Sequence, residues 1–241
     1  MKRILIVLIV VFLSACTTQP TALPTKTAKF YPSSTPFVKT KIPTLTPMPT
    51  KTSTSIPTAT SMPLPVVIEG KGDQVVNFSK TWEDPTILKI QNSGGSNFIV
   101  KNYDDNGEEI DLLVNTIGKY QGVILIGVTS LENPTTRFSI RSSGSWRIEA
   151  DPFEFSYLES IQIPGSLEGE NDNVVLLIGS PDLINFKCDR GYIGVWAYTS
   201  TKRSLIVNEV GPYSGQSILP NGTAMLVIKS TGKWSFDVTA K

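Results

Sequence analysis

Three aromatic residues recur at even spacing within one short stretch of the chain. Tyr192, Trp196 and Tyr198 are separated by four and two positions, so a β-strand would carry all three on one face. An exposed aromatic strip of this kind stacks on sugar rings or grips another protein. The spacing therefore marks these residues as candidate ligand-binding residues. The alternative is that the strip packs against another part of the same chain.

A second group with possible chemistry is the acidic turn Asp104-Asp105-Asn106-Gly107-Glu108-Glu109. Carboxylate and amide oxygens are the ligands that Ca²⁺ prefers, and the ion takes roughly six to eight of them. The spacing does not match that of an EF-hand loop. Asp104 and Asp105 are therefore weak calcium candidates, and a solvated hairpin turn explains the segment equally well. No other metal and no cofactor is expected.

The chain contains no histidine. Its absence excludes Ser-His-Asp and Cys-His nucleophile pairs as well as His-ligated metals. The sequence also lacks a phosphate-binding glycine loop of the P-loop or dinucleotide type. Two carboxylates can hydrolyse glycosides without histidine, but no pair of acids stands out beyond the turns. We therefore expect a protein that is not an enzyme, with a carboxylate-dependent hydrolase as an alternative.

The N-terminus has the features of an export signal. Lys2 and Arg3 precede an apolar run, Ile4 to Leu13, that is too short to span a membrane as a helix. The four residues Leu13-Ser14-Ala15-Cys16 resemble the lipobox of bacterial lipoproteins. This resemblance implies a signal peptide over residues 1–15, a lipid on Cys16, and a position on the extracytoplasmic face of the cell membrane. An ordinary signal peptide with a chance cysteine is the alternative.

Residues 16–65 differ in composition from the remainder and predict a disordered tether. Residues 17–65 hold 14 Thr and 10 Pro, and their five charged side chains are all Lys. Proline restricts the backbone to extended forms, and the apolar residues are too sparse to build a core. Residues 69–241 carry 15 of the 22 basic side chains and all 21 acidic ones. This mildly acidic head argues against nucleic-acid binding, which needs a basic surface.

The head contains an internal repeat. One spaced motif occurs twice, as Asn115-x-x-Gly118-x-Tyr120-x-Gly122 and as Asn208-x-x-Gly211-x-Tyr213-x-Gly215. The motif is preceded by Gly72-Asp73-Gln74 or Asn171-Asp172-Asn173, and followed by Gly144-Ser145-Trp146 or Gly232-Lys233-Trp234. The order of these landmarks predicts two copies of one domain, at residues 66–152 and 164–241.

Each copy has the pattern of an all-β domain. Short runs of alternating or branched apolar residues recur between turn signals such as Asn106-Gly107 and Asn221-Gly222. This pattern predicts two tandem antiparallel β-sandwich domains, with Trp146 and Trp234 in their cores. Cys188 ends one apolar run, which favours a small buried residue over a thiol that pairs between chains.

The repeated landmarks also carry a resemblance. The Tyr103-Asp104 turn, the Asn-x-x-Gly-x-Tyr corner and the closing Gly-x-Trp strand resemble those of uncharacterised exported bacterial proteins and of small jelly-roll domains appended to secreted peptidases. The resemblance covers residues 68–150 and, more weakly, 168–241. It implies a jelly-roll-like β-sandwich and no known activity. The second copy departs from it, since Tyr198-Thr199-Ser200 stands in place of the Tyr-Asp turn.

The leading functional expectation is a lipid-anchored, non-catalytic module that binds a cell-wall or extracellular polysaccharide. The alternative is a structural or accessory subunit of an envelope protein complex. The expected partners are thus the membrane, through Cys16, and a polysaccharide or an envelope protein.

Overall fold

The computed structural model describes residues 63–128 and 133–241, which fall in one compact unit running from Thr58 to Lys241. The signal peptide, Cys16 and residues 16–62 of the tether lie outside the described residues. The described chain is all-β, with one 3₁₀ turn, η1 (Phe155–Tyr157). None of its helices is long and apolar enough to cross a membrane.

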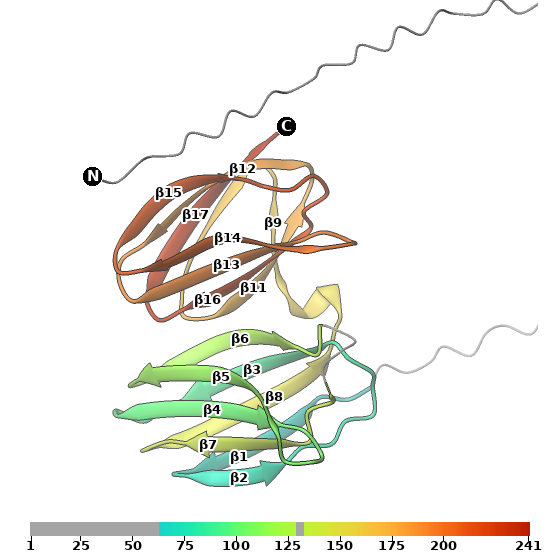
Figure 1. Cartoon of the computed structure of the whole chain (residues 1–241), viewed down its shortest axis with the longest axis vertical. Coiled ribbons are helices and arrows are strands. Elements are labelled where there is room, and N and C mark those ends of the chain that lie inside the picture. The colour runs from blue at the N-terminus through green and yellow to red at the C-terminus, as the bar shows by residue number, and fades with distance from the viewer. Residues whose placement is uncertain (1–62, 129–132) are drawn as a thin grey trace, which may run out of the picture. The chain divides into compact units, whose positions relative to one another are not determined.

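Sandwich 1, residues 66–152, is built from eight strands (Figure 1). They are β1 (Val66–Lys71), β2 (Gln74–Asn77), β3 (Thr86–Asn92), β4 (Asn97–Tyr103), β5 (Glu109–Ile117), β6 (Tyr120–Ile126), β7 (Arg137–Arg141) and β8 (Ser145–Pro152). The strand orders are β1-β8-β3-β6 in one sheet and β2-β7-β4-β5 in the other. This is the order of a jelly roll, in which each sheet takes strands from both halves of the domain.

Sandwich 2, residues 159–240, repeats this topology and adds one strand. Its strands are β9 (Glu159–Gln162), β10 (Gly165–Glu170), β11 (Asn173–Ile178), β12 (Pro181–Cys188), β13 (Tyr192–Tyr198), β14 (Arg203–Val210), β15 (Tyr213–Ile218), β16 (Met225–Ser230) and β17 (Lys233–Ala240). The sheet orders are β10-β17-β12-β15 and β14-β13-β16-β11-β9. The additional strand β9 precedes residue 164 and pairs in parallel with β11, whereas every other pairing is antiparallel.

The core of each sandwich follows from the period of two along its strands. Leu88 and Ile90 of β3 face Phe98 and Val100 of β4, and all four are fully buried. Trp146 and Trp234 are each 3% exposed, which confirms their predicted place in the two cores. Cys188 is also buried, and its thiol donates to the Arg190 carbonyl oxygen at 3.2 Å.

The sequence pattern did not reveal the strands β1, β9 and β10. The sequences of β1 and β10, VVIEGK and GSLEGE, contain glycines and acids that do not resemble a strand. The glycines are there for packing, because a Cβ on Gly70 would lie 2.3 Å from Cζ2 of Trp146. A Cβ on Gly169 would lie 2.4 Å from the same atom of Trp234. Each edge strand therefore passes directly over the tryptophan that closes its own core.

Candidate functional site

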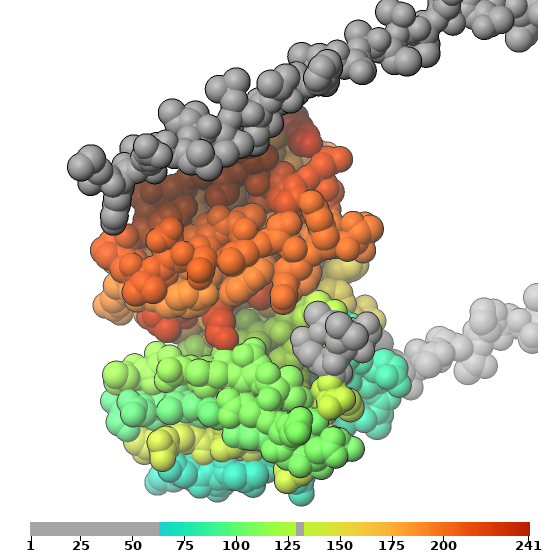
Figure 2. All heavy atoms as spheres, in the orientation of Figure 1, coloured from blue at the N-terminus to red at the C-terminus, as the bar shows by residue number. Residues whose placement is uncertain are grey.

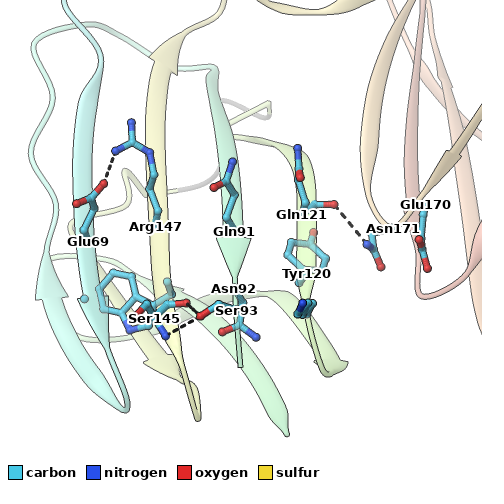
Figure 3. Close-up of a pocket in the computed structure, with 13 residues that line it drawn as sticks. Glu69, Gln91, Asn92, Ser93, Tyr120, Gln121, Ser145, Arg147, Glu170 and Asn171 are labelled. Atoms are coloured by element: carbon cyan, nitrogen blue, oxygen red, sulfur yellow. Dashed lines mark hydrogen bonds and ion pairs between the residues drawn. The ribbon is translucent and has the colours of Figure 1, made fainter. Parts of the chain in front are cut away.

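A row of polar side chains crosses the outer face of the β1-β8-β3-β6 sheet. Glu69 pairs with Arg147, Arg147 with Gln91, and Gln91 with Gln121 across the four strands. Residues directly opposite each other on neighbouring strands point to the same face. Their chain neighbours Ile90 and Ile148 are buried, so the row itself faces outwards. Figure 3 shows these four side chains side by side.

The charges in this row are paired with each other. The Arg147 guanidinium donates to the Glu69 carboxylate and to Oε2 of Glu149, the latter at 2.7 Å. The ion pair between Arg147 and Glu149 lowers the pKa of the Glu149 carboxyl and raises the pKa of the Arg147 guanidinium. The amides of Gln91 and Gln121 form no hydrogen bond with the side chain of any other described residue. The row therefore combines a fixed, neutralised ionic part with two amides that can bind a ligand.

A groove of about 990 Å³ runs over this row. Ser93, Ser145 and Lys119 line it on the side of sandwich 1, while Glu170 and Asn171 line it from sandwich 2. Asn171 also donates its side-chain amide to the Gln121 carbonyl oxygen at 3.4 Å (Figure 3). Trp146 contributes little to the surface, because its ring lies beneath Gly70 and its Nε1 donates to the Gly72 carbonyl oxygen. Most of the side chains that line the groove are polar.

The corresponding face of sandwich 2 differs from this groove. Lys187 and Ser214 occupy the positions of Gln91 and Gln121, as the pairings with Trp234 and Trp146 establish. In the next row, Asn185 donates to Asp237 at 2.6 Å and accepts from Gln216 at 2.8 Å. The amides in this row thus bond to one another, whereas those of Gln91 and Gln121 do not.

The aromatic strip lies on β13, as the sequence pattern predicted, with its three residues on the outer face. Trp196 and Tyr198 are half-buried, and both line a pocket of about 350 Å³. Leu113 and Leu125 of sandwich 1 line the same pocket. Tyr192 lies outside it, and its hydroxyl is 3.2 Å from Oδ1 of Asn208. Trp196 and Tyr198 therefore face sandwich 1, whereas Tyr192 does not take part in this pocket.

The junction between the sandwiches is partly apolar. An apolar cluster combines Ile87 and Leu125 of sandwich 1 with Val174, Leu176 and Met225 of sandwich 2. Trp196 lies at a position where sandwich 1 has Lys101, because Val195 and Val100 hold equivalent places in the two pairings. The two copies therefore differ at a face that is covered in sandwich 2.

Polar contacts complete this junction. The Tyr120 hydroxyl donates to Oδ2 of Asp172 at 2.6 Å, and the Ser230 backbone N–H donates to Oδ1 at 2.8 Å. Asp172 is 7% exposed, and burial raises its pKa to about 6. The Lys229 ammonium donates to the Leu112 carbonyl oxygen at 2.8 Å. Tyr120 and Asp172 both belong to the repeated landmarks, but the sequence pattern did not predict that they would meet.

The acidic turn is organised by hydrogen bonds. Oδ1 of Asp104 accepts from the Glu108 backbone N–H at 2.8 Å, and Oδ2 accepts from the Asn133 amide at 2.8 Å. The Glu108 N–H lowers the pKa of Asp104. Asp105 is exposed. Within residues 63–128 and 133–241, no three Cys, Asp or Glu side chains are grouped to hold a metal ion.

No protein-family model and no curated protein matches the sequence. Among solved structures, the chain is similar to one described as "cAMP bound PfPKA-R (141-441)". The TM-score is 0.21 and the identity 9%, over 71% of this chain and 70% of that one. A similarity this low does not bear on the function of the chain.

Proposed function

We propose that this chain is a lipid-anchored extracytoplasmic protein that binds a polysaccharide without altering it. The observation that carries the proposal is the polar row Glu69–Arg147–Gln91–Gln121 in an open groove. The lipobox-like Leu13-Ser14-Ala15-Cys16 and the Thr/Pro-rich residues that follow support the location. On this proposal, the tether extends the head from the membrane to its ligand.

The chemistry of the row suits sugars. Each sugar hydroxyl both donates and accepts hydrogen bonds, and an amide offers two donors and an acceptor in one plane. Gln91 and Gln121 are neighbours across two paired strands, so adjacent hydroxyls on one sugar can reach both amides. The groove volume of about 990 Å³ accommodates a ligand larger than a single sugar residue. The Arg147 guanidinium, held by Glu69 and Glu149, supplies a donor in a set orientation.

The test is retention on cell-wall polysaccharides and a glycan panel. The predicted mature chain, residues 16–241 with Cys16→Ser, is compared with a Gln91→Ala/Gln121→Ala variant. We expect the variant to bind at least tenfold more weakly, because about 1 kcal/mol is lost at each amide. Lys187→Ala/Ser214→Ala, at the equivalent positions of sandwich 2, is the matched control and should bind like the parent.

Two outcomes would contradict the proposal. One is equal binding by the Gln91→Ala/Gln121→Ala variant and the parent, which would place the site elsewhere. The other is no retention of the parent on any polysaccharide. In the second case, a protein that co-purifies from membranes would favour an accessory subunit of an envelope complex.

A further inference from the structure

The two sandwiches contact each other through different surfaces. Sandwich 1 contributes its β5–β6 side, with Tyr120 and Leu125, whereas sandwich 2 contributes its β11–β16 face, with Asp172 and Val174. A contact between two different surfaces of a repeated domain can recur, since each copy carries both surfaces. The internal contact uses one surface of each copy and leaves the other surface of each without a described partner.

The surface of sandwich 2 that corresponds to the Tyr120 side is open. Tyr213 and Tyr120 hold equivalent positions in the two sheets. Tyr213 lies opposite Cys188, which lies opposite Trp234. Tyr120 lies opposite Asn92, which lies opposite Trp146. Both tyrosine hydroxyls lie in the same place, because a Cβ on Gly122 or Gly215 would be 2.3 Å from the hydroxyl. Five residues on, Ile218 corresponds to Leu125. Leu125 is 9% exposed at the junction, whereas Ile218 is 75% exposed.

The apolar surface extends from Ile218 to the neighbouring edge strand. β14 and β15 are edge strands of the two sheets, and the Ser217 hydroxyl joins them by donating to the Ile206 carbonyl oxygen at 3.1 Å. Leu205 of β14 is also exposed. Figure 2 shows the orange atoms of β14 at the molecular surface. This edge is therefore an uncovered version of the surface that sandwich 1 uses.

The surface of sandwich 1 that corresponds to the Asp172 face is open too. Asp73 accepts from the Ser142 backbone N–H at 2.9 Å, as Asp172 accepts from that of Ser230 at 2.8 Å. The second oxygen of Asp73 lies 3.7 Å from Nε of Arg141, whose position is that of Lys229. Val75 holds the position of Val174 and is 70% exposed. The acceptor is thus oriented in the same way in both copies.

We infer that the chain associates head to tail with a second copy of itself. The β14–β15 edge of sandwich 2 in one molecule docks on the β2–β7 face of sandwich 1 in the next. Tyr213 donates to Asp73 of the next molecule, and Ile218 packs on Val75, which reproduces the contacts of Tyr120 with Asp172 and of Leu125 with Val174. A contact between two different surfaces leaves one free surface at each end of an assembly, so further molecules can add and chains of molecules form.

This contact is weaker than the internal one. Lys101, Arg137 and Ser139 stand in sandwich 1 where sandwich 2 has Trp196, Met225 and Val227. The contact between molecules therefore buries less apolar area than the internal junction does. It also lacks an equivalent of Leu158, which the segment connecting the two sandwiches contributes to the internal junction. Molecules anchored in one membrane are confined to a thin layer, so they meet more often than molecules in dilute solution do. Association is accordingly expected at a crowded surface rather than in dilute solution.

The test uses two variants that each block one end. In residues 16–241 with Cys16→Ser, Ile218→Lys blocks the β14–β15 edge and Val75→Lys blocks the β2–β7 face. Both side chains are largely exposed, so neither change should lower the melting temperature by more than a few degrees. Ile117→Lys, at another exposed apolar residue on β5, is the control.

Sedimentation is measured up to about 1 mM, on the order of the effective concentration of linked partners. The parent and the Ile117→Lys control should form progressively larger species. Each blocked variant alone should associate at least tenfold more weakly, and the equimolar mixture of the two should form dimers but no longer chains. A parent that stays monomeric, a parent that stops at a dimer, or a mixture that stays monomeric would each overturn the inference.

Discussion

The Tyr120 hydroxyl lies 2.6 Å from Oδ2 of Asp172, and this hydrogen bond joins two jelly rolls that are copies of one domain. Both residues are buried, so water does not compete for the bond. The equivalent hydroxyl of Tyr213 has no hydrogen-bond partner among the described residues. The same tyrosine thus has two environments in one chain, which provides an internal control for its contribution.

Tyr120→Phe should destabilise the protein. The change removes the donor to Oδ2 of Asp172 and leaves a buried oxygen unpaired, at a cost of about 1–3 kcal/mol in the free energy of unfolding. Denaturant unfolding in dilute solution measures the effect. Tyr213→Phe should change this free energy by less than about 0.5 kcal/mol. Equal effects of the two substitutions would show that the Tyr120–Asp172 bond does not stabilise the junction.

Asp172 should make stability fall as the pH rises. Burial raises its folded-state pKa to about 6 from an ordinary value of 3.8, so the folded protein holds this proton more tightly than the unfolded chain. Its contribution is greatest below about pH 4 and decreases by up to about 3 kcal/mol as the pH rises to about 6. Asp172→Asn should remove this part of the pH dependence in melting curves. Asp73→Asn, at the exposed equivalent position of sandwich 1, is the matched control.

Trp196→Ala should affect stability rather than ligand binding. The indole is half-buried and lines the pocket next to Leu113 and Leu125, so we expect a loss of about 2 kcal/mol. Lys101→Ala, at the equivalent position of sandwich 1, should cost far less. Chemical denaturation and polysaccharide retention are measured on the same samples. Weakened retention with unchanged stability would instead make the aromatic strip the binding site.

Gly70→Ala should disturb the core of sandwich 1. A Cβ at this position would lie 2.3 Å from Cζ2 of Trp146, so the strand or the indole must move. Forced overpacking of this kind costs about 1–3 kcal/mol, and Trp146 fluorescence should change with it. Gly95→Ala is the control, because its Cβ would meet no atom within 4 Å. A neutral Gly70→Ala would show that β1 can move away from the tryptophan.

Asp104→Ala should lower the melting temperature whether or not Ca²⁺ is present. Both carboxylate oxygens accept hydrogen bonds from N–H groups, which hold the turn between β4 and β5. The parent should show no rise in melting temperature on addition of Ca²⁺. A rise that Asp104→Ala abolishes would restore the turn as a calcium site.

The local pattern was sufficient to predict the class of the fold. Alternation placed Trp146 and Trp234 in the cores, and the repeated Asn-x-x-Gly-x-Tyr corner indicated two copies. The strands β1 and β10 were missed because their glycines make room for tryptophans that are distant in sequence, which no local pattern reveals. The sequence also left undecided what the aromatic strip packs against, since alternation assigns a side chain to a face but does not say what covers that face.

The sequence by itself determined the all-β class, the tandem repeat and the absence of histidine chemistry, because composition and period are properties of neighbouring residues. The tertiary structure decided which distant residues meet. Glu69, Arg147, Gln91 and Gln121 form one row through the order and register of β1, β8, β3 and β6. Tyr120 reaches Asp172 in the same way, across the junction of the two copies. Strand order and register arise from packing over long separations in the chain, so no local stretch of sequence contains them.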